Sequence, residues 1–434
     1  MLIYSHKITP RVRYIFNVLL GDMLGLEVSF TNEKESFSAS EEAKISYSHS
    51  KIGDEIHFKS QGLLHETGVK DQGIRVSENE NGKYFYAHNS TDSVLNFDAF
   101  AASFFLLARY EECLPHIRDK YNRFEASESL GFKNGFLTEP VVDQWLLRIR
   151  DRLGSKYPDL VFKKRKYEFI STIDIDNAYA FKYKGFMRTL GAYIRSAVNL
   201  NFEEVFERTN VLLGRATDPY DTYDFQLEIQ KKYNLRTIYF FLLADYGVND
   251  KNVPFYNSEF QSLIKHLGDY AEIGIHPGFN SNQKNSKLKT EKKRLEKIIH
   301  RSVTKSRQHF LILHLPHTYQ KLIDNDIRED HSMGYAEHTG FRAGTCTPYR
   351  FFDLDLETPT ELIVYPFSIM EATLKYYMKL QPAEAKAEIS KIVQKVKKVN
   401  GTFIGLWHNE TLTDRDIWAG WRDVFTHMVK EAKE

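Results

Sequence analysis

The sequence is poor in cysteine and has no long apolar run. Its two cysteines, Cys113 and Cys346, lie far apart among 434 residues, which argues against a disulfide framework and is compatible with a reducing compartment. No segment reaches the roughly 18–20 apolar residues that a membrane-spanning helix requires. His, Lys and Arg occur within the first 13 residues, so the N-terminus lacks the uninterrupted apolar segment of a signal peptide. We therefore predict a cytoplasmic protein without an integral membrane segment.

The sequence also lacks an excess of either charge. It has 59 Lys and Arg against 58 Asp and Glu, a formal net charge of +1. A chain without a net field has no global attraction for nucleic acid or for an anionic membrane, so we expect no nucleic-acid partner. The composition, with 42% hydrophobic and 27% charged residues, is that of a globular protein. Its length exceeds one ordinary core and predicts two or three domains.

A domain boundary is expected near residue 155. The chain before it mixes short strand-like segments and turns with two helical patterns, FDAFAASFFLLARYEECL and PVVDQWLLRIRDRL. The stretch that follows, GSKYPDLVFKKRKY, is polar, basic and interrupted by Gly and Pro. We predict an N-terminal α/β domain of unknown role over residues 1–155 and a second domain over residues 156–434.

The second domain alternates apolar runs with amphipathic helices. This alternation predicts a parallel sheet with helices outside it, either open or closed into a barrel. In both forms, ligands bind where the C-terminal ends of the strands meet. The predicted strands are YEFISTI, RTIYFFLL, AEIGI, HFLILHL, ELIVYPF and TFIGLW.

The first of these strands ends in STIDIDN and carries two acids. Residues i and i+2 of a strand share a face, so Asp174 and Asp176 are expected to point the same way. Two like charges so close repel each other unless a cation or a shared proton lies between them. The pair is therefore a candidate site. The alternative is a solvated strand-to-loop junction in which Asp accepts turn hydrogen bonds.

Two histidines follow other strands. His276 comes directly after AEIGI, and His408 directly after TFIGLW. If the strand ends meet, an Asp-x-Asp pair and a histidine offer carboxylate oxygen and imidazole nitrogen, a common ligand set for zinc. Without a metal, His276 is a hydrogen-bonding loop residue and His408 a capping residue before the last helix.

The order of these motifs resembles that of a known family. T-x-D-x-D after one strand, E-I-G-x-H after another, then F-R-x-G-T-x-x-P and a strand ending in L-W-H-N look like the polysaccharide deacetylase family, that is, carbohydrate esterase family 4 with a NodB-like domain. Three longer segments, GFRAGTCTPYRFFDLD, YPFSIMEATL and LWHNETL, resemble a bacterial subgroup with an extra uncharacterised N-terminal domain. The resemblance implies a distorted, incomplete (β/α) barrel.

The resemblance also implies a chemistry. Members use a divalent metal, usually zinc, to hydrolyse an N-acetyl group from an amino sugar, so an N-acetylated sugar or glycan precursor is the implied substrate. Asp174 would be the general base and Asp176 a metal ligand. His276 matches the first histidine of the H-x-x-x-H motif. His408 matches the histidine of the last motif and would be the general acid.

One metal-ligand position departs from the family pattern. Asn280 stands where the second metal histidine is expected, and an amide oxygen is a poorer zinc ligand than imidazole nitrogen. Either Asn280 coordinates weakly, another histidine substitutes, or the site has lost its metal. We predict His309 as the substitute, ahead of His314 and His317, although its place at the start of a predicted strand would put it at the wrong end of a barrel.

The third motif supplies an arginine. Arg342 matches the family residue that fixes the catalytic aspartate, and a guanidinium fork suits that role. It is otherwise a surface residue, or a partner of Asp330. Trp407 and Tyr349 could form walls for a sugar ring or belong to the core. Two other functions stay open: hydrolysis of a non-carbohydrate amide, and glycan binding by a metal-free pseudoenzyme.

Overall fold

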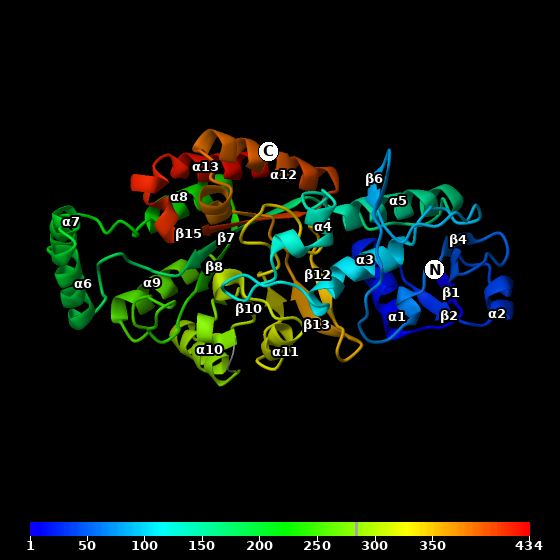
Figure 1. Cartoon of the computed structure of the whole chain (residues 1–434), viewed down its shortest axis with the longest axis horizontal. Helices are drawn as coiled ribbons and strands as arrows, with labels where there is room; N and C mark the ends of the chain where they lie inside the picture. The colour runs from blue at the N-terminus through cyan, green and yellow to red at the C-terminus, as the bar shows by residue number, and fades with distance from the viewer. Residues whose placement is uncertain (283–284) are drawn as a thin grey trace.

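A nine-stranded sheet forms the centre of the protein. The structure is a computed structural model that describes residues 1–282 and 285–434 (Figure 1). The strand order is β12-β13-β11-β10-β9-β8-β7-β15-β14, and every neighbouring pair is parallel except β12 with β13. The strands are β7 (Glu168–Ile175), β8 (Arg236–Phe241), β9 (Glu272–Ile275), β10 (Lys305–Ser306), β11 (Glu329–Asp330), β12 (Tyr349–Asp353), β13 (Thr358–Val364), β14 (Ile369–Met370) and β15 (Thr402–His408).

Helices cover the sheet on two sides. Figure 1 shows α8, α12 and α13 along one side of the strands and α9, α10 and α11 along the other. Helix α12 ends before Gly401, and the chain then enters β15. The helices of this part are α6 (Phe186–Val198), α7 (Phe202–Leu212), α8 (Tyr223–Tyr233), α9 (Ser258–Gly268), α10 (Asn285–Ile299), α11 (His317–Ile323), α12 (Pro382–Lys398) and α13 (Trp421–Lys433).

The predicted closed form of the sheet, a barrel, is not confirmed. Within residues 1–282 and 285–434, the edge strands β12 and β14 each pair with one neighbour and not with each other. β14 has two residues and offers little backbone for further pairing. β12 is covered by α1, α3 and the π-helical turn that follows α1. The mixed α/β character predicted from the sequence is correct, but the described sheet is open.

The two faces of the sheet carry different side chains. Because side chains alternate along a strand, Ile170, Thr172 and Asp174 share one face of β7. This face joins a small apolar cluster that includes Ile238 and Ile404 of the neighbouring strands. The opposite face packs against the helices in the main core. Polar residues at the C-terminal end of the face that carries Asp174 therefore lie next to this apolar cluster.

One predicted strand is wrong. HFLILHL, residues 309–315, was expected to be extended, but the strand of this region is β10 and ends at Ser306. Phe310 and Leu311 have φ values of 60° and 56°, which belong to the left-handed region and interrupt an extended chain. His309 therefore follows a strand instead of opening one.

A second sheet lies in the N-terminal part. Its order is β2-β1-β3-β4, with all pairs parallel. Thr9 caps α1 by accepting a hydrogen bond from the backbone nitrogen of Val12, and Pro10 opens the helix. The elements of this part are β1 (Leu2–Ser5), α1 (Pro10–Phe16), the π-helical turn Asn17–Met23, β2 (Ser29–Thr31), α2 (Lys34–Ala39), β3 (Lys44–Ser48), β4 (Ile56–Lys59), β5 (Ser77–Asn79), β6 (Gly82–Tyr84), α3 (Ala99–Leu107), α4 (Leu130–Lys133) and α5 (Val141–Lys156).

The N-terminal part packs tightly on the β12–β13 edge. The ring of Phe352 in β12 lies 5.0 Å from that of Tyr14 and 5.1 Å from that of Phe104. One core cluster includes apolar residues from both parts of the chain. The boundary near residue 155 stays a prediction. No helix within the described residues is both long and apolar enough to cross a bilayer.

A buried ion-pair cluster fastens the two parts. Glu112 accepts hydrogen bonds from Arg342 at 2.6 and 2.8 Å and from Arg109 at 2.7 Å, and all three side chains are buried. Burial alone would raise the pKa of Glu112, but the two guanidinium groups outweigh it and lower the pKa to about 2. The carboxylate therefore contributes stability that is present above its unfolded pKa and is lost as the pH falls toward 2.

We expect Glu112→Gln to lower the free energy of unfolding by about 3–5 kcal/mol at pH 7, because the buried guanidinium of Arg342 loses its counter-ion and that of Arg109 keeps only Glu111. Urea unfolding followed by circular dichroism measures the free energy of unfolding of the wild type and the variant. The difference between wild type and variant should shrink below about pH 4, because acid protonates Glu112 as the wild type unfolds. Glu361→Gln, which removes an exposed partner of Arg350, should change stability by less than about 1 kcal/mol. Equal losses in the two variants would contradict the prediction.

Candidate metal centre

The C-terminal ends of four parallel strands bring the polar clusters together. Asp174 in β7 lies directly opposite His408 in β15 and Phe240 in β8. Asp176 follows β7 by one residue, and His276 follows the last residue of β9. Because aligned parallel strands end at one edge of a sheet, Asp174 and His408 become neighbours although they are 234 positions apart.

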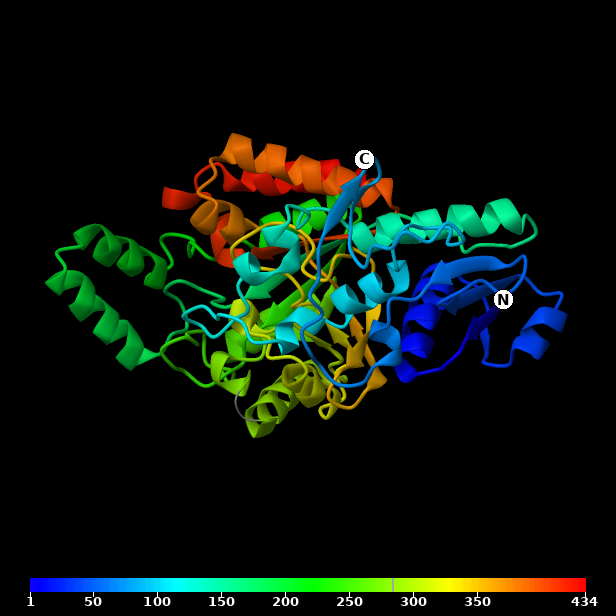
Figure 2. The same cartoon turned by 45° about the vertical axis from the view of Figure 1, so that its right-hand side comes forward.

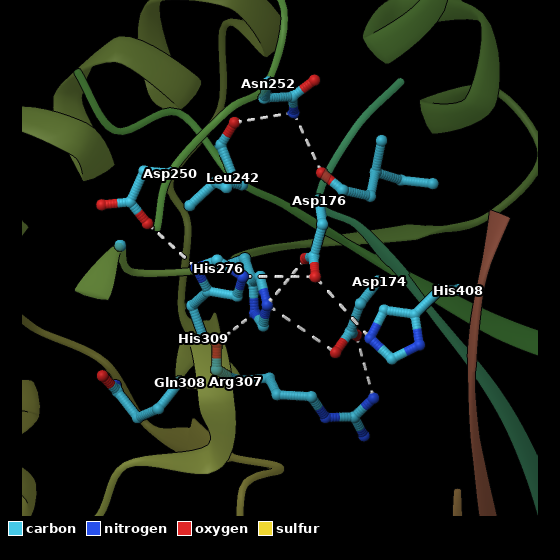
Figure 3. A network of polar contacts seen from close by, with 12 residues as sticks. Asp174, Asp176, Leu242, Asp250, Asn252, His276, Arg307, Gln308, His309 and His408 are labelled. Carbon is cyan, nitrogen blue, oxygen red and sulfur yellow. Dashed lines mark hydrogen bonds and ion pairs between the residues drawn. The ribbon is translucent and has the colours of Figure 1, made fainter. Parts of the chain in front are cut away.

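Three side chains form a compact group of metal-ligating type. Asp176 Oδ1 lies 3.0 Å from His276 Nε2, and Asp176 Oδ2 lies 3.2 Å from His309 Nε2 (Figure 3). The ligand atoms of the three residues all lie within 4.8 Å of one another. Both histidines are buried. The predicted substitution of His309 for the second motif histidine is consistent with this geometry.

Both imidazole rings are held by their other nitrogen. His276 Nδ1 donates to the backbone oxygen of Arg307 at 2.5 Å, and His309 Nδ1 donates to Asp250 Oδ1 at 2.9 Å. A carbonyl or carboxylate oxygen can only accept, so each Nδ1 carries a hydrogen. In the neutral ring, Nε2 then presents a lone pair toward Asp176. Such an outer partner is the usual support of a metal-binding histidine.

This donor set fits a divalent cation. Lone pairs on two Nε2 atoms and a carboxylate oxygen repel each other at 3.0–3.2 Å unless a cation or added protons lie between them. Burial favours a neutral Asp176, but the two histidines outweigh it and hold its pKa well below the usual range. Burial lowers the pKa of His309, yet Asp176 and Asp250 raise it to about 9. The space between these three side chains therefore favours positive charge, and Asp176, His276 and His309 would hold a divalent cation there.

A second carboxylate stands beside this triad. Asp174 is buried, and its Oδ1 accepts a hydrogen bond from Arg307 Nη1 at 3.0 Å. Arg307 Nη1 also donates to Thr172 Oγ1 at 2.8 Å, and this second bond fixes the guanidinium against the face of β7 that carries Asp174. Asp174 Oδ2 lies 3.8 Å from His276 Nε2. This oxygen faces the triad without belonging to it.

His408 completes the group from the neighbouring strand. Its Nδ1 donates to Glu371 Oε1 at 2.6 Å, and its Nε2 lies 3.7 Å from Asp176 Oδ2. Burial lowers the pKa of His408, but Glu371 outweighs it, with help from Asp176 and Asp174, and raises the pKa to about 10. His408 is therefore protonated at neutral pH. Burial and the nearby Asp176 also raise the pKa of Glu410, on the same rim, to about 7.

These groups line a cavity of about 270 Å³. Its walls include Tyr376, Tyr377 and Trp418, and Arg123 reaches it from the N-terminal part of the chain. Of the two alternatives for Trp407 and Tyr349, the structure supports the core: both side chains are buried, and neither lines the cavity. In each case the sequence shows an aromatic residue near a motif, but only the fold shows which side of the strand it occupies.

The alternative metal ligands are not brought to the site. Asn280 is exposed in the short helix Phe279–Asn282 and does not line the cavity. The prediction of a weak Asn280 ligand is therefore corrected, because the helical turn directs this residue to solvent. His314 Nε2 hydrogen-bonds instead to the backbone oxygen of Asn122, and His317 opens α11 at the surface.

The predicted role of Arg342 is also corrected. Its guanidinium binds Glu112, while Arg307 binds Asp174. Asp330, the other proposed partner of Arg342, is bound by Ser306, Ser332 and Tyr319. The two arginines differ in role because Arg342 faces the N-terminal part of the chain, where it binds the buried carboxylate of Glu112.

Sequence reasoning missed three supporting residues: Arg307, Asp250 and Glu371. Arg307 directly follows β10 and Glu371 directly follows β14, so the strand-end rule would have found both if these two-residue strands had been recognised. Asp250 lies in a loop without any pattern. Nothing in the sequence singles it out.

Known proteins resemble this chain only distantly. Residues 1–158 match a family of unknown function, DUF7033. No curated protein matches the sequence. A putative polysaccharide deacetylase from Mycobacterium smegmatis is 12% identical over 62% of this chain and 86% of its own, with a TM-score of 0.39. A CE4 family pseudoenzyme from Bacillus anthracis is 12% identical over 62% and 61%, with a TM-score of 0.31.

A third neighbour is the polysaccharide deacetylase Bc1974 from Bacillus cereus, 12% identical over 62% of this chain and 88% of its own, with a TM-score of 0.30. Of these three neighbours, two are named polysaccharide deacetylases, one of them putative, and the third is named a CE4 family pseudoenzyme. Because these TM-scores lie below 0.5, the likenesses carry no argument about function, which depends on the geometry of the site.

We expect the purified protein to bind one Zn²⁺, and His276→Ala or His309→Ala to weaken the binding by at least about 100-fold, since each removes a ligand. Asp250→Ala should weaken it by about 10–100-fold through loss of the outer support of His309. Competition with a chromophoric chelator, together with metal analysis, measures this. Asn280→Ala is the control and should bind as the wild type does. Weaker binding by Asn280→Ala, or unchanged binding by His309→Ala, would refute the assignment.

Proposed function

We propose that this protein is a metal-dependent hydrolase that removes the N-acetyl group of an amino sugar or glycan precursor. The observation that carries the proposal is the arrangement of three groups around one cavity: a triad of metal-ligating type, the carboxylate of Asp174 outside that triad, and the protonated ring of His408. Hydrolysis of an amide needs these three functions: activation of water, polarisation of the carbonyl and a proton for the departing amine.

Asp174 would act at the start of the reaction. A divalent ion held by Asp176, His276 and His309 supplies Lewis acidity that makes water more acidic and an amide carbonyl more electrophilic. Asp174 Oδ2 faces the same three ligand side chains and would take the proton from the water that attacks the amide carbonyl. Arg307 holds the other oxygen of Asp174, so the base keeps one orientation.

His408 would act at the end of the reaction. It carries a proton at neutral pH because Glu371 stabilises the charged ring. Its Nε2 faces Asp176 and the cavity, so it would give this proton to the amine as the C–N bond breaks. The carbonyl carbon keeps the water oxygen and leaves as acetic acid, which ionises to acetate, and the amine leaves with the proton from His408. Asp174 then releases to solvent the proton it took from water, and His408 takes a proton back from solvent.

The cavity walls favour a sugar over a purely apolar amide. Tyr376 and Tyr377 are partly exposed and Trp418 is buried, so flat rings stand beside the polar centre. Rings with one apolar face and a polar rim suit aromatic walls and hydrogen-bonding edges. Arg123 is held in place by Asp119 and adds a donor group to the wall.

We expect the zinc-loaded protein to release acetate from N-acetylated amino sugars or their oligomers. Asp174→Asn should lower kcat by about 10²–10⁴-fold, because the side-chain amide of Asn cannot take the proton from water. An enzyme-coupled acetate assay over a panel of sugars measures the rate. Asp174→Asn must still bind zinc, which separates loss of the base from loss of the metal. Release of acetate only from non-carbohydrate amides would change the substrate class, and no release from any amide would reject the hydrolase.

The pH profile gives a second test. A general acid must be protonated, so kcat is expected to fall as the pH rises through the pKa of His408. Glu371→Gln removes the carboxylate that raises this pKa, so the alkaline limb should move to lower pH by about one to three units. Rates between pH 6 and 11 would show the shift. An unchanged alkaline limb in a folded Glu371→Gln protein would exclude His408 as the acid.

A further inference from the structure

Two helices project from the body of the protein between β7 and α8. Helices α6 and α7 pack against each other as a hairpin, with Tyr193 Oη 2.9 Å from Thr209 Oγ1. Figures 1 and 2 show this hairpin at one end of the molecule, away from the helices that cover the sheet. It begins ten residues after Asp176 and has no part in the site described above.

The outer side of the hairpin is apolar. On α6, five large side chains recur at helical spacing and are exposed, from Phe186 at 79% to Val198 at 76%. The turn and α7 add further exposed residues, among them Phe206 at 71%. We call this set the apolar face of the hairpin: Phe186, Met187, Leu190, Ile194, Val198, Leu200, Phe202 and Phe206. Eight exposed apolar side chains on one small hairpin mark a contact surface.

Positive charge borders the apolar face. Residues 182–201 contain four basic residues and no Asp or Glu, and residues 182–215 contain six Lys or Arg against three Glu. Arg188 and Arg195, seven residues apart, lie on one side of the apolar stripe of α6. Arg195 is exposed, whereas Arg188 donates to the backbone oxygens of Lys251 and Asn252. The overall charge of +1 therefore hides a local excess of +3. An amphipathic helix with basic residues beside its apolar stripe is typical of a helix that lies in a membrane surface.

A basic cavity lies at the foot of the hairpin. It has a volume of about 580 Å³, and its walls include Lys184, Arg188, Arg195 and Arg208, together with Glu204 and Glu207. Lys184 is buried and donates to Asn177 Oδ1. Within the described parts of the chain, no carboxylate oxygen lies within 4.0 Å of Lys184 Nζ. Burial and Arg188 lower the pKa of Lys184 to about 7, and an anionic headgroup beside it would favour its charged form.

We propose that the hairpin binds the surface of a membrane rich in anionic lipid, with its apolar face in the boundary between headgroups and acyl chains and its basic residues on the headgroups. A second copy of the chain would not explain the charge, because two hairpins meeting face to face would bring two positive surfaces together. The proposal does not depend on the hydrolase activity.

The test is sedimentation of the full-length protein with lipid vesicles. Vesicles of phosphatidylcholine with about 30% phosphatidylglycerol should bind the protein at least about tenfold more tightly than phosphatidylcholine alone. The double variant Phe186→Ser, Ile194→Ser should lose at least about tenfold in affinity, because it removes two exposed apolar side chains. Arg195→Glu should weaken binding to the anionic vesicles and leave the weak binding to neutral ones unchanged.

Matched controls use equally exposed residues elsewhere. Val161→Ser with Leu356→Ser removes two exposed apolar side chains far from the hairpin, and Arg75→Glu reverses an exposed charge. Both should bind vesicles as the wild type does. No vesicle binding, equal losses in test and control variants, or a dimer in light scattering that Phe186→Ser, Ile194→Ser abolishes would each overturn the proposal.

Discussion

The carboxylate of Asp176 between two imidazole rings is the interaction on which the rest of the site depends. It sets two lone pairs and a negative charge against each other in a buried place, an arrangement that is stable only with positive charge at its centre. Every surrounding contact supports this arrangement. The backbone oxygen of Arg307 and the carboxylate of Asp250 fix the rings, and both act through Nδ1, so the Nε2 atoms stay directed at Asp176.

Two further pairs give the centre its chemical asymmetry. Asp174 is held by Arg307, and His408, its neighbour on the adjacent strand, is held by Glu371. The first pair leaves an acceptor and the second a donor beside the same three ligand side chains. With a cation held by the triad, the cavity would combine an acceptor, a donor and a Lewis acid, and the proposed hydrolysis rests on that combination.

The N-terminal part is more than an attachment to the sheet. It covers the β12–β13 edge, supplies the buried acid that binds Arg342 and places Arg123 in the wall of the cavity. At the opposite end, the α6–α7 hairpin carries an exposed apolar face and local positive charge. The near-neutral composition is thus an average over regions of different charge, and net charge alone is a poor guide to what each surface binds.

The sequence by itself determined which residues end the long strands. Asp174, Asp176, His276 and His408 each follow an apolar run of strand type, and parallel strands must align their ends, so pattern and topology together placed all four. Only the tertiary structure decided the partners. The two-residue strand before His309 has too little pattern to recognise, and Arg342 and Arg307 look alike in sequence. Which carboxylate a guanidinium binds depends on packing across more than a hundred residues, which no local pattern records.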